Sequence, residues 1–249
     1  MFGKGATTSA SALGLSQVPY ILMYHRIAEV AENSLCVTPR RFAEQMAWLS
    51  RHGLRGVGVG TLVDAMRAGR QRRLVGITFD DGYAGLVESA LPALLRHGFT
   101  ATMFISSGLL GGTNEWDAVP WRLMPADQVR ELAAAGMEIG SHTVTHLRMA
   151  GADAGQLKAE VCDSRTSLSD LIGAPVRGFA YPYGSMDAAA RHAVSSAGYD
   201  YACATMTPVN ELGLMTLPRM FIAECDGGLR MTAKRLLFKP YFALHGRDR

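Results

Sequence analysis

The chain has 249 residues, of which 48% are hydrophobic and 19% are charged, and its formal net charge is +3. This apolar content is enough for a large folded core and differs from that of a disordered chain. The nearly balanced charge argues against a broad face for nucleic acid. No stretch reaches the ~18 uninterrupted apolar residues that a membrane-spanning helix needs, so we expect no membrane span.

Short apolar runs, typical of buried strands, alternate along the chain with segments of helical periodicity. Strands are predicted at residues 20–24, 74–79, 100–105, 137–140, 178–181, 199–204 and 217–222. Helices are predicted at residues 39–53, 86–97, 125–135, 154–171 and 186–197. The basic and bulky segment 230–242 is predicted to pack as a final helix whose length Pro240 limits. A polar, glycine-rich insertion at residues 111–124 breaks the alternation.

This alternation, with about seven strand–helix units and no change in composition, predicts a single α/β domain over residues 18–249. Residues 1–17 are expected to form a flexible tail. They lack the apolar core of a secretory leader, so we expect a cytoplasmic location, with a secreted or periplasmic one open if a leader was removed. A doubly wound sheet and a (β/α) barrel both fit the pattern, and both gather functional residues where strands end and helices begin.

Polar side chains follow several of the predicted strands, and two histidines and two aspartates stand out among them. His142 and His146 are four residues apart, a spacing that places two imidazoles on one face of a helical turn. Two neutral imidazoles and one carboxylate form a facial triad that leaves open positions on a divalent metal. Asp80 and Asp81 are adjacent at a strand end, so their side chains point in opposite directions. One can bind metal while the other takes a proton from the metal-bound water, which predicts metal-assisted hydrolysis of an acyl bond.

Three segments resemble the first three motifs of the polysaccharide deacetylases, which form carbohydrate esterase family 4 and share the NodB homology domain. These segments are Thr78–Tyr83 (TFDDGY), Ser141–His146 (SHTVTH) and Phe179–Gly184 (FAYPYG). Their order and spacing match over roughly residues 18–219, which is most of the chain. The segments Tyr20–Arg26 and Thr38–Gly53 resemble the branch that acts in bacterial exopolysaccharide and poly-N-acetylglucosamine systems.

The resemblance implies a role for each matching residue of the first two motifs. Asp80 would be the catalytic base, and Asp81, His142 and His146 would bind one divalent metal ion. In this family the metal is usually zinc, and some members accept nickel, cobalt or iron. The implied fold is a distorted (β/α) barrel of about seven strands.

The third motif would form the acetyl pocket. Tyr181, Pro182 and Tyr183 would line this pocket, and the backbone N–H of Tyr183 would help to hold the oxyanion. Two more residues, Trp121 and Arg219, are candidates for substrate contact. For Trp121, stacking on a sugar face and capping of the insertion both remain open, whereas the second tryptophan of the insertion, at position 116, is expected to be a cap.

Two departures from the family pattern affect the expected chemistry. Ala180 stands where the third motif usually carries an arginine that orients the base, and Arg219 and Arg177 are the candidates to replace it. The late motif that carries the acid histidine is not recognisable. In the exopolysaccharide branch the corresponding histidine follows the first strand. His25 fits that description and is the expected general acid, and His245 is the alternative.

The expected function is therefore a metal-dependent hydrolase that removes an N-acetyl group from an N-acetylated sugar in a glycan or glycan precursor. One alternative is a deacetylase or deformylase of a small non-polymeric amide or ester. The other is a catalytically silent carbohydrate-binding domain, which the missing arginine favours and the intact base and metal triad oppose. The expected partner is an N-acetylated carbohydrate, and segment 230–242 could also lie on anionic lipid.

Overall fold

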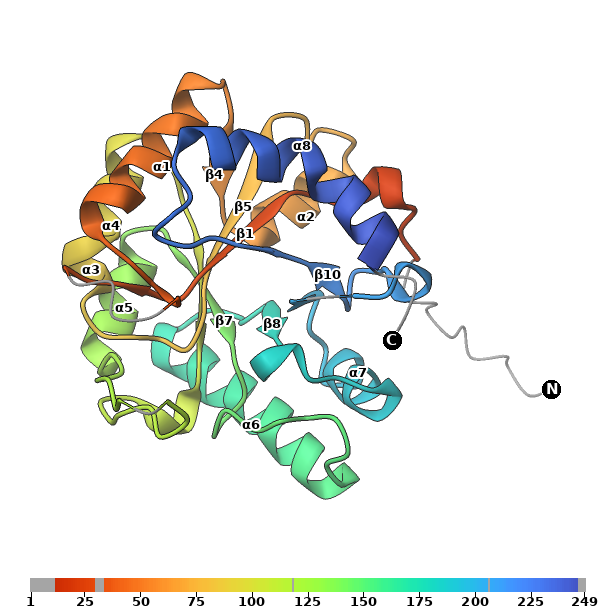
Figure 1. The fold of residues 1–249 in the computed structure, drawn as a ribbon. Helices are drawn as coiled ribbons and strands as arrows, with labels where there is room; N and C mark the ends of the chain where they lie inside the picture. The colour runs from red at the N-terminus through yellow and green to blue at the C-terminus, as the bar shows by residue number, and fades with distance from the viewer. Residues whose placement is uncertain (1–11, 30–33, 118, 206, 246–249) are drawn as a thin grey trace.

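A computed structural model describes residues 12–29, 34–117, 119–205 and 207–245, apart from the side chains of residues 242 and 245. Its centre is a nearly closed barrel of parallel strands surrounded by helices (Figure 1). Eight strands pair in the order β10-β9-β8-β7-β6-β5-β1-β11. Their bounds are β1 (Ile21–Tyr24), β5 (Leu74–Phe79), β6 (Thr102–Ile105), β7 (Glu138–Ser141), β8 (Gly178–Ala180), β9 (Tyr201–Ala204), β10 (Leu217–Pro218) and β11 (Met220–Phe221). The predicted (β/α) barrel is confirmed, with eight strands on this path in place of about seven.

One short segment of the chain, which contains β10 and β11, closes the barrel. Strands β10 and β11 are the two ends of the sheet path, and β10 pairs with β9 while β11 pairs with β1. Only Arg219 separates them in sequence, so one short extended segment joins the two edges of the sheet. The sequence predicted a single strand over residues 217–222. The structure divides it because its two halves pair with strands on opposite edges.

Three further strands lie off this path. Strand β4 (Arg55–Val57) pairs with the first half of β5. Strands β2 (Arg26–Ile27) and β3 (Cys36–Val37) form a small parallel sheet of their own. None of the three was predicted from the sequence, because segments of two or three residues show no readable periodicity.

The helices pack outside the sheet (Figure 1). They are α1 (Pro39–Arg51), α2 (Val59–Arg67), α3 (Leu86–Ser89), α4 (Leu91–Arg96), α5 (Ala126–Ala134), α6 (Ala154–Ile172), α7 (Ala188–Ser196) and α8 (Gly228–His245). The helix predicted at 86–97 is divided at Ala90, because Pro92 occupies the first turn of α4, where a proline is tolerated. Helix α2 was not predicted. Helix α8 continues through Pro240 to His245, so the expectation that this proline limits the length of the helix was wrong.

Side chains of the strands divide between two cores according to the pleat. The larger core lies between strands and helices and includes Leu22, Ile77 and Phe179. The smaller core includes strand residues of the opposite pleat together with residues of α2. Two of its members, Phe104 and Tyr201, fill so much of the barrel that neighbouring strands carry glycine there. A Cβ on Gly140 would lie 2.5 Å from the Phe104 ring, and one on Gly178 would lie 2.2 Å from the Tyr201 hydroxyl.

The predicted flexible tail, residues 1–17, falls mostly outside the described part of the chain. Of its described residues, Leu13 N donates to Leu212 O at 2.9 Å, and Leu15–Gln17 form a short 3₁₀ helix. Among the helices within the described residues, none is both long enough and apolar enough to cross a bilayer.

Candidate active site

Asp81, His142 and His146 meet at the carboxyl end of the barrel, just beyond β5 and β7. All three are buried, and their candidate ligand atoms lie within 4.8 Å of one another. The Nε2 atom of His142 is 3.3 Å from Asp81 Oδ1, and that of His146 is 3.2 Å from the same oxygen. The structure therefore brings together the three residues that the sequence analysis assigned to a metal.

The backbone around these residues is left-handed at several non-glycine positions. The φ angles are +69° at Asp81, +68° at Thr143, +62° at His146 and +59° at Tyr183. Such conformations cost energy in L-residues and cluster where a site needs them. The sequence analysis was therefore wrong about the local backbone conformation that brings these residues together. The two histidines approach through an irregular loop, not a helical turn, and Asp81 turns away from Asp80 in a left-handed bend, not along an extended strand.

Hydrogen bonds prepare the imidazoles to accept a cation. His142 Nδ1 lies 2.8 Å from the carbonyl oxygen of Ala180, which can only accept, so Nδ1 carries the proton and Nε2 carries the lone pair. That lone pair faces a carboxylate oxygen. Two acceptors repel each other unless a proton or a cation lies between them, so the donor set fits a divalent metal ion. His146 Nδ1 is 3.2 Å from the hydroxyl of Tyr183, which can hold the second ring in the same way.

The ionisation states agree with this interpretation. Burial lowers the pKa of His146 and outweighs the opposing hydrogen bond with Asp81, which favours the neutral ring that binds metals. Burial raises the pKa of Asp81, but the facing imidazoles of His142 and His146 outweigh it and hold this pKa well below its usual value. An anionic carboxylate and the neutral ring of His146 therefore face the same point.

Glu160 of helix α6 holds the loop that carries both histidines. Its Oε2 accepts from Val144 N at 2.7 Å and from Thr145 N at 2.9 Å, and its Oε1 accepts from Thr145 Oγ1 at 2.6 Å. These partners lie between His142 and His146 in the sequence. The sequence analysis missed Glu160, because a glutamate on an amphipathic helix carries no local signal of such a role.

Asp80 occupies a separate position inside the mouth of the barrel. Both of its oxygens accept from Arg219, Oδ1 from Nη1 at 2.6 Å and Oδ2 from Nη2 at 2.7 Å. Arg219 also donates to Thr78 Oγ1 and to Ala204 O, and its side chain has no exposed area. Arg219 is thus the partner that fixes the orientation of Asp80. The sequence analysis also considered Arg219 for substrate contact, but its side chain is buried. Arg177 instead pairs with Asp64 and Asp200.

The charge of Asp80 is maintained by this pairing. Burial raises its pKa, but the charges of Arg219 and His142 and the hydrogen bonds from Arg219 outweigh burial, so the pKa lies below its usual value. A carboxylate that is ionised, buried and separate from the metal ligands has the properties of a general base.

His25 follows β1 and lies near both aspartates. Burial raises the pKa of each carboxyl, and the charge of a protonated His25 is among the influences that lower it. Its ring packs beside Phe221, with 6.1 Å between ring centroids. Among the described residues, no hydrogen-bond partner reaches its buried Nδ1. The alternative acid, His245, is the last residue of α8, and its side chain lies outside the described part of the chain.

The third motif contributes one exposed residue to the rim of the site. Tyr183 is 43% exposed and packs edge-on against His146, with 4.6 Å between ring centroids. Tyr181 has no exposed area, and its hydroxyl donates to Met215 O at 3.1 Å. Its side chain therefore packs in the core, while Pro182 is buried beside it. Within the described residues no acceptor is recorded for the Tyr183 N–H, which leaves it available to a ligand.

The insertion at residues 111–124 packs against the candidate metal ligands. It pairs with the DDGY turn through an antiparallel bridge between Tyr83 and Leu123. Trp116 stacks on His146, with 3.8 Å between ring centroids, and Trp121 lies under the guanidinium of Arg26 at 3.1 Å. Trp116, expected only to cap the loop, is thus the tryptophan in contact with a candidate ligand.

Comparisons with known proteins identify a family for this chain. Residues 67–202, just over half of the chain, match the family model described as polysaccharide deacetylase. The chain is also 29% identical over 187 residues to YxkH of Bacillus subtilis, a protein whose name places it provisionally among polysaccharide deacetylases. That alignment covers 74% of this chain and 63% of YxkH, so the chain spans less than two thirds of this relative.

Two solved structures share the fold. The deacetylase PplD of Streptococcus pyogenes, solved in complex with acetate, superposes with a TM-score of 0.76 at 23% identity, over 90% of this chain and 98% of PplD. IcaB of Ammonifex degensii superposes with a TM-score of 0.74 at 23% identity, over 87% of this chain and 96% of IcaB. At these identities the likeness shows that the barrel architecture is common to all three.

Proposed function

The chain belongs to the polysaccharide deacetylase family, carbohydrate esterase family 4, and we propose that it is a metal-dependent enzyme that removes N-acetyl groups from an N-acetylated sugar. The observation that carries this proposal is the convergence of Asp81, His142 and His146 beside a second carboxylate, Asp80, that Arg219 holds apart from them. A family of acetyl-removing enzymes and a site with a ligand set and a separate base point to the same hydrolysis.

Asp81, His142 and His146 would hold the metal ion. Two imidazoles and a carboxylate suit zinc, which we propose as the native ion, with nickel, cobalt or iron as alternatives. When bound, such an ion polarises a carbonyl and makes water acidic enough to lose a proton near pH 7. Trp116 and Tyr183 flank the ring of His146 and limit its movement before the ion arrives.

Asp80 would accept a proton from the attacking water. Arg219 already occupies both carboxylate oxygens at 2.6 and 2.7 Å, so the carboxylate is fixed in position and stays ionised. The Tyr183 N–H would donate to the oxygen that becomes negative as the acetyl carbon is attacked. His25, whose Nδ1 has no partner among the described residues, would give a proton to the departing amine.

The substrate is proposed to be a glycan or glycan precursor. Support comes from the family and from PplD, a deacetylase whose structure holds acetate. Trp116 and the exposed Tyr183 also present aromatic surface beside the ligands, and sugar faces pack well on such surface. The alternative of a silent carbohydrate-binding domain depended on the missing motif arginine. Arg219 now supplies the expected partner of Asp80, which removes the argument for that alternative.

The experiment that tests this function measures metal content and release of amine from N-acetylglucosamine oligomers in the same samples. Asp80→Asn should keep metal and lose turnover, whereas His142→Ala should lose both. His52→Ala is a matched control, because His52 ends helix α1 with its Nδ1 near Trp48 O and should change neither. A His142→Ala protein without metal but with full activity would contradict the proposal. Activity on small amides or acetyl esters, without release of amine from the oligomers, would be consistent with the proposed metal site but would contradict a sugar substrate.

A further inference from the structure

Helix α8 exposes a ridge of large apolar side chains. Of the eight exposed large hydrophobic residues recorded in the described part of the chain, five lie on this helix. They are Leu229, Leu236, Leu237, Tyr241 and Leu244. Leu229 is 90% exposed, and Leu236 and Leu244 are 72% and 73% exposed. A run of this kind on one element is unusual for a surface that meets only water.

The ridge follows from the periodicity of α8. Residues 229, 236, 237 and 244 recur at intervals of seven or eight, so they lie on one face of a helix that turns every 3.6 residues. Met231 and Phe238 lie on the opposite face and are buried against the barrel. The helix therefore has two apolar faces, one covered by the protein and one open.

Cations line both flanks of the ridge. Helical spacing puts Arg230 and Lys234 on one side of it and Arg235 and Lys239 on the other. The segment Gly228–His245 contains no aspartate or glutamate. Lys234 pairs with Asp226, and Lys239 donates to the carbonyl of Ser16, but neither of these contacts brings an acidic group to the outer face.

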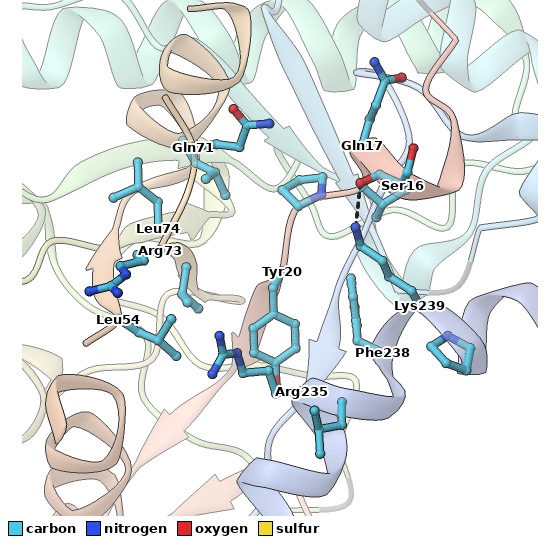
Figure 2. A pocket seen from close by; sticks show the side chains of 16 residues that line it. Ser16, Gln17, Tyr20, Leu54, Gln71, Arg73, Leu74, Arg235, Phe238 and Lys239 are labelled. Carbon is cyan, nitrogen blue, oxygen red and sulfur yellow. Dashed lines mark hydrogen bonds between the residues drawn. The ribbon is translucent and has the colours of Figure 1, made fainter. Parts of the chain in front are cut away.

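The ridge stands between two hollows. One, of about 480 Å³, is lined by Phe221, Leu237 and Tyr241 among others. The second, also about 480 Å³, is lined by Arg235 and Lys239 of α8 and by Arg73 across from them (Figure 2). Arg73 ends an exposed loop that also carries Arg70 and Arg72. The surface is thus a projecting apolar ridge with a hollow along one flank that three cations, Arg73, Arg235 and Lys239, line.

We propose that α8 docks on the surface of an anionic lipid bilayer. An apolar ridge about 23 Å long with cations on both flanks matches a helix that lies in the headgroup layer, with its apolar face in the acyl region and its cations on lipid phosphates. Charge selects this occupant over a second copy of the chain, because two α8 helices packed together would set cations against cations. A projecting ridge also fits a deformable surface better than a rigid groove.

Vesicle co-sedimentation of the full chain tests this docking. Vesicles of phosphatidylcholine alone are compared with vesicles that include phosphatidylglycerol, each at low and at high salt. We expect binding to the anionic vesicles, weakening at high salt, and a loss of about tenfold or more in the double variant Leu236→Glu/Leu244→Glu. Leu95→Glu is the matched control, because Leu95 is 52% exposed on α4 and its replacement should leave binding unchanged.

Charge is tested separately with Arg235→Glu, which should weaken binding to anionic vesicles while leaving the thermal unfolding midpoint close to that of the parent. Absence of binding to anionic vesicles would overturn the proposal, as would equal binding by the double variant. Self-association of the parent chain that the double variant abolishes, without vesicle binding, would assign the ridge to a second copy instead.

Discussion

Each end of the barrel holds a carboxylate in a different environment: Glu138 at the amino end is half-buried, and Asp81 at the carboxyl end is buried. At the amino end, Glu138 begins β7 and accepts from Gly60 N at 2.8 Å, Thr102 Oγ1 at 2.6 Å and Tyr201 Oη at 2.9 Å. Every partner donates, and the first turn of helix α2 sits directly against the charge. At the carboxyl end, Asp81 faces two imidazole nitrogens at 3.2 and 3.3 Å, one of which carries a lone pair.

This difference distinguishes a carboxylate with a structural role, Glu138, from a candidate functional carboxylate, Asp81, in the same barrel. The amino end is satisfied by the chain alone, and its residues have ordinary backbone conformations. Burial raises the pKa of Tyr201 and the charge of Glu138 raises it further, so the phenol remains a donor. At the carboxyl end, left-handed backbone at non-glycine residues brings one carboxylate and two imidazoles together, which is typical of a functional site. Replacing residues at the two ends should therefore affect different properties.

The largest effect is expected from Arg219→Met. It leaves Asp80 buried without its partner, and breaking a buried ion pair in this way costs about 3–5 kcal/mol. Turnover should fall by at least ~100-fold because the base loses both its charge and its orientation. Chemical denaturation and amine release measure the two effects. Arg219→Lys keeps the charge but not the paired geometry, so its losses should be smaller; equal losses in both variants would show that the charge alone is not sufficient and that the paired geometry is required.

The sign of the pH dependence follows from the lowered pKa of Asp80. In the parent chain the ion pair contributes stability that is fully present above ~3.9 and is lost as the pH falls through the lower pKa of the folded state. Without Arg219, burial raises the pKa of Asp80, so activity should be lost at a higher pH on the acid side. A pH–rate profile of Arg219→Met whose acid limb superposes on that of the parent would argue against this account.

The second largest effect is expected at the amino end. Glu138→Gln removes the charge beside α2 and turns one acceptor into a donor that meets other donors, which should cost about 1–3 kcal/mol of stability. Metal content and turnover per folded molecule should not change. Thermal unfolding, elemental analysis and amine release measure these three properties. Loss of metal in Glu138→Gln, with the fold intact, would break the distinction between the two ends.

The sequence was sufficient to predict features that depend on neighbouring residues and on the spacing of motifs. It identified Asp80, Asp81 and the two histidines because each follows a strand end, and parallel strands bring those ends to one rim. It could not foresee their local geometry, since left-handed turns at Asp81 and His146 arise from tertiary packing. The role of Arg219 was likewise open, because the ion pair spans 139 residues and exists only once β10 and β11 close the barrel.

A smaller effect, on metal affinity, is expected from Glu160→Gln. This change keeps the shape of the side chain but weakens its three hydrogen bonds to the loop between His142 and His146. Supporting residues of this kind typically change metal affinity 10–100-fold, and for this conservative change we expect about tenfold. Competition with a chelator measures it. Glu131→Gln, an exposed change on α5, is the control and should bind metal as the parent does.

The smallest effect compares the two tryptophans of the insertion. Trp116→Ala removes the ring stacked on His146 at 3.8 Å, and such aromatic pairs contribute about 0.5–1.5 kcal/mol. Metal affinity should therefore fall a few-fold, while Trp116→Phe should restore most of it. Trp121→Ala removes the ring under Arg26, which touches no candidate ligand, so metal affinity should stay at the parent value. If the two alanine variants lost affinity equally, the insertion would act as one structural unit and Trp116 would have no separate role at the metal site.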